Sequence, residues 1–279
     1  MHRIIIILVL VVLFLAGLAT TDYVSAGSST GFYEKSDGIY DDWGICRTTP
    51  HGENGYYQVS ETGFRPIIAF ESLGEEIAEA YALGGEIAQK YPDEFQRAEA
   101  IFHFVRDRVD YTTDEDQFNY KEFAQNADEV AVAIQKSGTG YGDCEDSAVL
   151  LAVMYRGAGY RSAIVVGKSH TACLVYLPGY DKASVVFELD GEPGWVWAEA
   201  TGRNNPFGWT SKEFIDVNLA SYEIADEVLR PAGIPKAPAK AVAKSGGTSS
   251  GQPFPFFGVV ILLWLISWFS SLFRRRSAG

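Results

Sequence analysis

The stretch "GDCEDSAVLLAVMYRGAGYRSAIVVGKSHTACLVYL", residues 142–177, decides the fold class of this chain. Its first part places apolar side chains at helical spacing after Asp143, a favourable N-cap residue, and Asp146 follows at the capping-box position. Gly157 or Gly159 is expected to end this helix. Beyond the helix, apolar residues recur with a period of two, which is typical of β-strands.

The sequence on either side extends this pattern. Upstream, residues 73–91 and 92–109 both carry apolar side chains at helical spacing, and a short helix is predicted after Asn126, with Glu129 at its capping-box position. Downstream, the period of strands is found in residues 161–167, 170–177, 183–189 and 194–202. Helices followed by a sheet predict an α+β fold, in which the helix that carries Cys144 packs on an antiparallel sheet.

The N-terminal end of the chain is hydrophobic. Residues 4–19 are uncharged, Arg3 precedes them, and residues 24–26 resemble a small-residue cleavage site. This apolar run is shorter than the roughly 20 residues that span a bilayer comfortably. We therefore interpret residues 1–26 as an export signal peptide, with an N-terminal membrane anchor as the alternative.

The C-terminal end has a longer apolar run. Residues 254–273 are uncharged and arginines follow them directly, which predicts a transmembrane helix with the basic tail, residues 274–279, in the cytoplasm. Residues 231–253, rich in Pro, Ala, Lys, Gly and Ser, are predicted to be a flexible linker. We expect a single-pass protein of the cell membrane whose folded domain lies outside the cytoplasm.

Between these ends, residues 27–70 are predicted to be loop-rich and residues 71–230 to form the folded domain. The net charge is −13 at pH 7. Because residues 1–21 and 231–279 carry basic residues and no acidic ones, the part between them is more acidic still. Such a surface repels nucleic acid and anionic lipid, and it favours cationic partners or a salty milieu.

Cys144 stands where a helix would stabilise a thiolate. The unpaired N–H groups and the dipole at a helix N-terminus favour an anion, so we expect the pKa of this thiol to lie below its ordinary value of about 8.5. Glu145 and Asp146 oppose this effect, unless their side chains point away from the thiol. The chain has three cysteines, so in an exported protein at least one stays unpaired. A nucleophilic Cys144 leaves only a Cys46–Cys173 disulfide.

A thiol nucleophile needs a base and a group that orients the base. His170 alternates with Cys173 along its predicted strand, so these two side chains are expected on opposite faces. If His170 faces the start of the helix, Cys173 lies on the reverse face and is not the nucleophile. Glu199, on a neighbouring predicted strand, is the candidate third member.

These residues carry a resemblance. The motifs "GDCEDSAVLLAVMYRGAGYRSAIVVG", "SHTACLVYL" and "WVWAEATG", with "AIFHFVRDRVDYTTD" upstream, resemble the transglutaminase-like superfamily of papain-like cysteine enzymes, especially its microbial exported or membrane-bound members. The resemblance covers roughly residues 90–205. It implies Cys144 as nucleophile, His170 as general base and acid, and Glu199 in a place usually taken by Asp. No cofactor is implied.

The function expected from this reading is a membrane-tethered thiol enzyme. It would act on peptide or protein amides through an acyl-enzyme at Cys144, by hydrolysis or acyl transfer. One alternative is an inactive module of the same fold that binds peptides or serves as a scaffold at the cell surface. Another is a metal site built from Cys, His and Glu, but the usual closely spaced second ligand is missing. Asp110, Asp114 and Asp116 lack the glycine and terminal Glu of a calcium-binding EF-hand loop, so no metal is predicted there.

Overall fold

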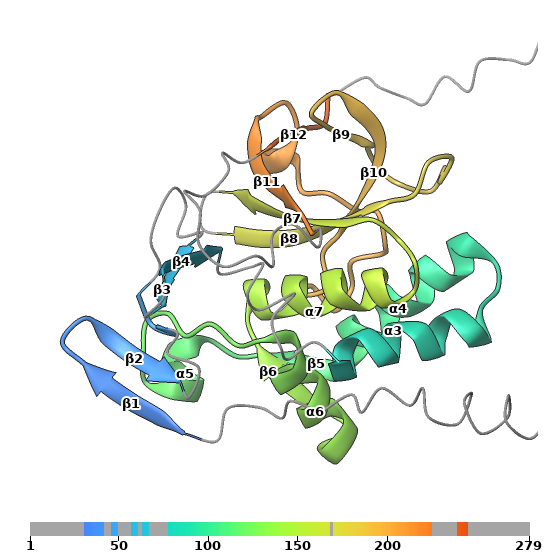
Figure 1. The fold of residues 1–279 in the computed structure, drawn as a ribbon. Helices are drawn as coiled ribbons and strands as arrows, with labels where there is room; N and C mark the ends of the chain where they lie inside the picture. The colour runs from blue at the N-terminus through green and yellow to red at the C-terminus, as the bar shows by residue number, and fades with distance from the viewer. Residues whose placement is uncertain are drawn as a thin grey trace, which may run out of the picture.

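The computed structural model describes residues 31–41, 46–49, 57–60, 63–66, 78–167, 170–224 and 239–244. The predicted signal peptide or anchor, transmembrane helix and basic tail lie outside these ranges. Within them, no helix combines the length and the apolar character that crossing a membrane requires. The part of the chain that is described has an α+β fold, as the sequence predicted, with a helical layer packed beside a sheet (Figure 1).

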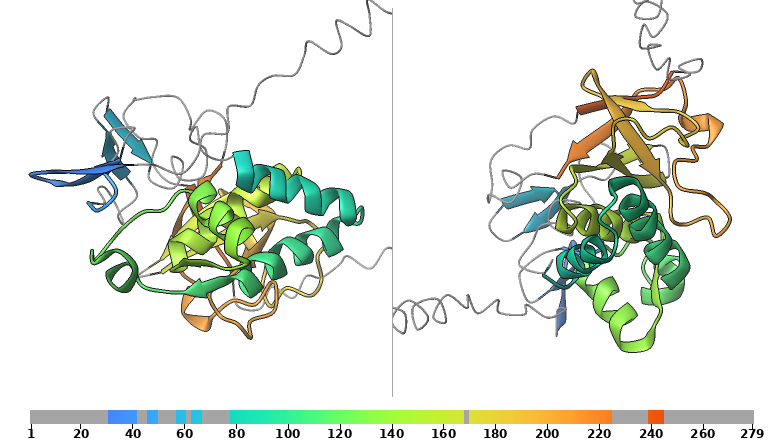
Figure 2. Two further views of the ribbon diagram at one scale, coloured as in Figure 1. Left: turned by 90° about the horizontal axis from the view of Figure 1, so that it is seen from below. Right: turned by 90° about the vertical axis from the view of Figure 1, so that its right-hand side faces the viewer.

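The helical layer surrounds one central helix. Its elements are α3 (Ala78–Lys90), α4 (Glu94–Arg108), α5 (Asp114–Phe118), α6 (Ala127–Ser137) and α7 (Cys144–Gly157). Helices α3, α4 and α6 pack on one side of α7, and the sheet packs on the other. Figure 2 shows the two layers from two further directions. Every residue from 146 to 155 is therefore buried, although the sequence suggested a helix with one apolar stripe.

Glycines let α3 and α7 approach closely. A Cβ added at Gly84 would lie 2.0 Å from the carbonyl oxygen of Met154, and one added at Gly157 would lie 2.0 Å from that of Tyr81. Side chains at these positions would push the two backbones apart. The close crossing holds α7 in the centre of the domain.

The sheet is a closed barrel, which the sequence did not predict. Its strands are β7 (Ser162–Gly167), β8 (His170–Tyr176), β9 (Phe187–Leu189), β10 (Glu192–Ala198), β11 (Leu219–Glu223) and β12 (Ala239–Val242). They follow the order β10-β8-β7-β11-β12-β9, and every neighbouring pair is antiparallel. Large side chains fill the interior, among them Trp195, Trp197 and Phe187. The four predicted strands are thus present, and β11 and β12 close them into a barrel.

Strand β12 corrects the prediction of a flexible linker over residues 231–253. Its segment alternates Ala with Lys or Val: Ala241 and Ala243 are buried in the barrel interior, whereas Lys240 and Lys244 are exposed. The strand pairs with both β11 and β9. Small side chains fit because the neighbouring aromatic rings already fill the barrel, so a stretch that looked like linker completes the sheet.

The segment between α4 and α7 contains a short helix and a short strand. It contains α5, whose N-cap Thr113 accepts a hydrogen bond from the backbone N–H of Asp116. Strand β5 (Val109–Tyr111) pairs in parallel with β6 (Gly140–Gly142). This short pair joins the end of α4 to the start of α7 and so fixes the position of Cys144.

The N-terminal part of the described chain forms two hairpins, β1 (Phe32–Lys35) with β2 (Gly38–Asp41), and β3 (Tyr57–Ser60) with β4 (Gly63–Pro66). A buried arginine attaches the first of these hairpins to the helical layer. Arg47 donates to Asp41 at 2.7 Å and to Glu129 of α6 at 3.0 Å. Pairing of this kind is needed because a buried guanidinium without partners would be strongly destabilising.

Candidate active site

Cys144 is the first residue of α7. Asp143 is the N-cap: its side chain accepts from the backbone N–H of Glu145 at 3.1 Å, and Asp146 accepts from the backbone N–H of Asp143 at 3.0 Å. This capping box was predicted from the sequence and is confirmed. A Cβ at Gly142 would lie 2.4 Å from Asp146 Oδ2, so the box closes because a glycine precedes it. The thiol is therefore held at the N-terminus of a rigid, buried helix.

His170 and Glu199 form a hydrogen-bonded pair. His170 begins β8, and its Nε2 bonds to Oε2 of Glu199, which directly follows β10. Thr201 holds the other oxygen of Glu199 through its backbone N–H, at 3.1 Å, and through its hydroxyl. With Nε2 engaged, Nδ1 is the ring nitrogen left for the proton of a neighbouring thiol.

The thiol lies beside this pair. The backbone N–H of Thr171, the residue after His170, acts on the Cys144 thiol and lowers its pKa, and the charge of Glu199 also acts on the thiol. His170 in turn acts electrostatically on Asp143, the residue before the cysteine. The structure therefore pairs His170 with Glu199 and places this pair within electrostatic reach of the start of α7, which carries Cys144.

The alternation along β8 places Cys173 away from the site, but on the face that packs against the helical layer, whereas the reverse face was expected from the sequence. Cys173 is fully buried against the helical layer, whereas Ala172 and Leu174 face the barrel interior. His170 shares the parity of the barrel face and lies at the rim of the barrel, where its side chain comes near the start of α7. All three cysteines of the chain are free, so the predicted Cys46–Cys173 disulfide is wrong. Cys46 pairs instead by its backbone with Tyr40.

The electrostatic setting of the thiol contradicts the expectation of a low pKa. Burial raises the pKa of Cys144 above its ordinary value, and the charges of Asp143 and Glu145 raise it further, while the N–H of Thr171 acts in the opposite direction. The helix N-terminus is thus outweighed by burial among acidic neighbours. Burial also raises the pKa of Glu145 and Asp146 well above the usual range. This shift favours their neutral forms, which oppose a thiolate less.

The pKa of the imidazole is shifted in the direction that suits a proton carrier. Burial lowers the pKa of His170, but the hydrogen bond and the charge of Glu199 raise it more, and Glu213 and Asp143 add to the increase. The resulting pKa lies above the ordinary value. Glu199 therefore stabilises the imidazolium that forms when His170 accepts a proton.

A cluster of carboxylates lies next to the site. Oxygens of Asp114, Glu122 and Glu145 lie within 4.8 Å of one another, which is a donor set that a divalent cation such as calcium takes. The sequence did not predict this group, because it depends on three separate segments. It had grouped Asp114 with Asp110 and Asp116, whereas in the structure Asp110 pairs with Arg203 and Asp116 accepts from Thr113.

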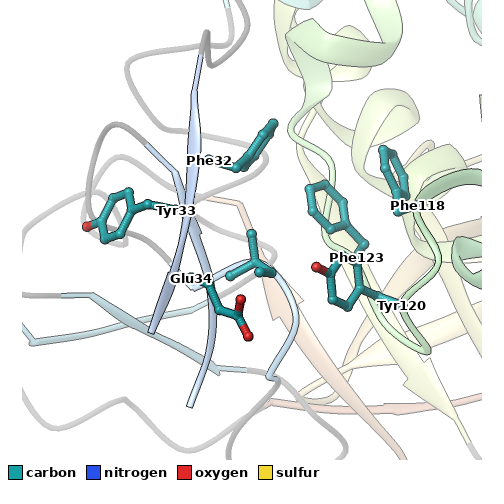
Figure 3. A pocket seen from close by; sticks show the side chains of 7 residues that line it. Phe32, Tyr33, Glu34, Phe118, Tyr120 and Phe123 are labelled. Atoms are coloured by element: carbon teal, nitrogen blue, oxygen red, sulfur yellow. The ribbon is translucent and has the colours of Figure 1, made fainter. Parts of the chain in front are cut away.

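An aromatic cleft lies beyond this cluster. It has a volume of about 390 Å³ between hairpin β1–β2 and the segment after α5. Figure 3 shows Phe32 and Glu34 on the hairpin side, opposite Phe118, Tyr120 and Phe123. The backbone N–H of Phe123 donates to the clustered Asp114 at 2.6 Å, so the cleft adjoins the carboxylates beside the thiol.

Along the chain, the candidate site consists of a cysteine at a helix N-terminus, followed by a histidine and a carboxylate on adjacent strands. Residues 81–212 match the model of the transglutaminase-like superfamily. The transglutaminase-like region includes the thiol, the imidazole and the carboxylate, together with α7 and the four strands from β7 to β10. A comparison with curated proteins gave no match.

Proposed function

We propose that this chain is a thiol enzyme that forms an acyl-enzyme through Cys144. One observation carries the proposal: the hydrogen-bonded His170–Glu199 pair lies within electrostatic reach of a thiol at the N-terminus of α7. This arrangement supplies a nucleophile, a base and a group that orients the base. The match of the transglutaminase-like region supports the same reading.

The geometry supports the following reaction. His170 Nδ1 takes the thiol proton while the sulfur of Cys144 attacks an amide carbonyl carbon, and the backbone N–H of Cys144 at the start of α7 can donate to the developing oxyanion. The imidazolium, stabilised by Glu199, then gives its proton to the leaving amine as the C–N bond breaks. Water or a second amine attacks the thioester, His170 again carries the proton, and the thiol is restored.

The substrates we propose are peptide or protein amides, with a preference for cationic segments. The aromatic cleft, which adjoins the carboxylate cluster through Asp114, supports this class, because aromatic faces and the carboxylate of Glu34 together favour an ammonium or guanidinium group. Glu34→Gln should weaken binding of a lysine-containing peptide and leave that of its acetyl-lysine counterpart unchanged. Equal weakening of both peptides would show that the carboxylate does not select charge.

The cellular setting is likewise a proposal. The uncharged runs in residues 4–19 and 254–273, each with arginine on one side, support export and a C-terminal membrane anchor. The domain would then act outside the cytoplasm. Protease added to intact cells should remove the domain and spare the tail, whereas protection of the domain until lysis would show the opposite orientation.

The test of the proposed reaction is capture of the acyl-enzyme. With p-nitrophenyl acetate at neutral pH, mass spectrometry should find one acetyl group on Cys144, and its formation should be abolished in Cys144→Ser and strongly slowed in His170→Gln. Cys173→Ser is the matched control, because that thiol is buried on the other face of β8. Acetylation that proceeds equally in His170→Gln would show that thiol and imidazole do not act together.

The raised pKa of the thiol favours a second candidate function. A buried thiol among carboxylates suits a module that keeps the fold and holds a peptide without reacting. In that case the wild-type protein would bind a basic peptide but form no acyl adduct, although a small alkylating agent still reached Cys144.

A further inference from the structure

The chain beyond the transglutaminase-like region returns to the catalytic imidazole. Phe214 is the last residue of the short 3-10 helix η2 (Lys212–Phe214), just past the matched residues. Its ring is buried and stacks on that of His170, with 5.4 Å between ring centroids and 24° between ring planes. No pattern along the chain predicts this contact, because η2 and β8 are far apart in the sequence.

His170 is the outermost ring of a column that runs into the barrel. Phe214 also stacks on Trp197, with 5.1 Å between centroids and 22° between planes, and Trp197 stacks on Phe187 at 5.3 Å and 27°. Trp197 and Phe187 are almost completely buried in the barrel core. The ring of Phe214 therefore cannot tilt without disturbing rings that are fixed by close packing.

The opposite strand leaves space for this ring. Gly167 is the partner of His170 in the β7–β8 register, and a Cβ added there would lie 2.9 Å from Cε1 of Phe214. A contact this short would force the ring to move. Two features thus position Phe214: its stacking on Trp197 in the barrel core, and the space beside Gly167 that its ring occupies.

We infer that Phe214 is a positioning residue that fixes the ring plane of His170. The torsion that turns an imidazole is broad and roughly two-fold, so a hydrogen bond to one nitrogen leaves the plane free to rock. Stacking on Phe214 removes this freedom while Nε2 stays on Glu199, and Nδ1 is thereby directed at the thiol. The inference rests on the proposed role of His170 as the base.

Other groups act on the imidazole but do not set its plane. Glu199 bonds to Nε2, while Glu213 and Asp143 act through charge, and the thiol of Cys144 lies beside the ring's own strand. Replacing Phe214 leaves all of these groups in place. A change of ring geometry can therefore be separated from a change of charge.

The experiment compares four variants. Phe214→Leu removes the ring but keeps an apolar side chain, Phe214→Tyr keeps the ring, and Gly167→Ala displaces the ring without altering it. Phe207→Leu is the matched control: Phe207 is another buried phenylalanine, but its ring packs on Phe102 and Tyr180. Acetylation by p-nitrophenyl acetate is measured as rate against reagent concentration, beside the thermal midpoint of each variant.

We expect Phe214→Leu and Gly167→Ala to lower the maximal acetylation rate by roughly 10- to 100-fold, with little change in the half-saturating concentration. Phe214→Tyr should restore the rate to nearly that of wild type. Phe207→Leu should lower the thermal midpoint without slowing acetylation. If Phe214→Leu loses no more rate than Phe207→Leu at a similar loss of thermal stability, the ring has only a structural role and the inference is wrong.

A second measurement does not need catalysis. In a Cys144→Ala background, nuclear magnetic resonance of the His170 ring, assigned with His170→Gln, should show one sharp set of signals with Nε2–H held on Glu199. Phe214→Leu should broaden these signals. Unchanged line shapes would overturn the inference even if the enzyme is active, whereas broadened signals in a protein that forms no acyl adduct would uphold the positioning and refute the proposed function.

Discussion

Removing the charge of Asp114 should stabilise the protein above neutral pH. This carboxylate begins α5 and is 3% exposed, and its Oδ2 accepts from the backbone N–H of Phe123 while Oδ1 has no hydrogen-bond partner. Burial, with the charges of Asp143 and Glu122, raises its pKa from 3.8 to about 7. In Asp114→Asn the amide oxygen can keep the bond to Phe123, and the amide nitrogen can donate to the neighbouring carboxylates.

The magnitude follows from linkage between ionisation and folding. A carboxyl whose pKa is higher in the folded state destabilises the fold as pH rises, because the unfolded chain loses its proton first. The penalty grows between pH 3.8 and about 7 and is constant above that range. At about 1.36 kcal/mol for each pKa unit, Asp114 costs up to about 4 kcal/mol at pH 8. Asp114→Asn should remove on the order of 2–4 kcal/mol of this penalty.

The assay is urea unfolding at several values between pH 4.5 and pH 8, with a chelator present. The stability gap between Asp114→Asn and wild type should widen as pH rises. Asp116→Asn on the same helix is the control, because Asp116 is exposed. Added calcium tests occupation of the carboxylate cluster, since a bound cation would stabilise wild type alone. A gap independent of pH, or a variant less stable than wild type at pH 8 with chelator, would refute the reasoning.

Three further predictions concern single contacts. Gly84→Ala should cost at least about 3 kcal/mol in urea unfolding, since its Cβ would meet the backbone of α7, whereas Gly85→Ala on the same helix meets only an ordinary contact at 3.6 Å and should cost nothing. Thr201→Val removes a hydroxyl donor to Glu199 and should slow acyl-enzyme formation by roughly tenfold, with Thr201→Ser as the rescue. Cys173→Ser should lose about 1–3 kcal/mol of stability and retain the wild-type acetylation rate.

The elements that the sequence predicted are those stabilised by nearby residues. Both capping boxes were read correctly, Asn126 with Glu129 and Asp143 with Asp146, because each is a contact between residues three apart on one helix. The spacing of apolar residues placed α3, α4 and the strands β7 to β10. The missed elements are short and depend on distant partners: β5 with β6, and β12 with β9 and β11.

The candidate site shows the same division. The order of cysteine, histidine and carboxylate was visible along the chain, and α+β packing made their approach plausible. Their electrostatics were not visible: the sequence predicted a lowered thiol pKa, whereas burial among carboxylates raises it. How deeply the thiol is buried depends on the packing of the helical layer against the barrel. The direction of its pKa shift therefore could not be predicted from the residues next to it along the chain.

By itself, the sequence determined where helices and strands begin and which three side chains are candidates for catalysis, because caps and periodicity act within a few residues. Only the tertiary structure decided that the sheet closes into a barrel, that Asp114, Glu122 and Glu145 converge beside the thiol, and that Phe214 covers His170. These arrangements join segments whose separation along the chain carries no periodic signal. They form because the close packing of the helical layer and the barrel determines which distant side chains become neighbours.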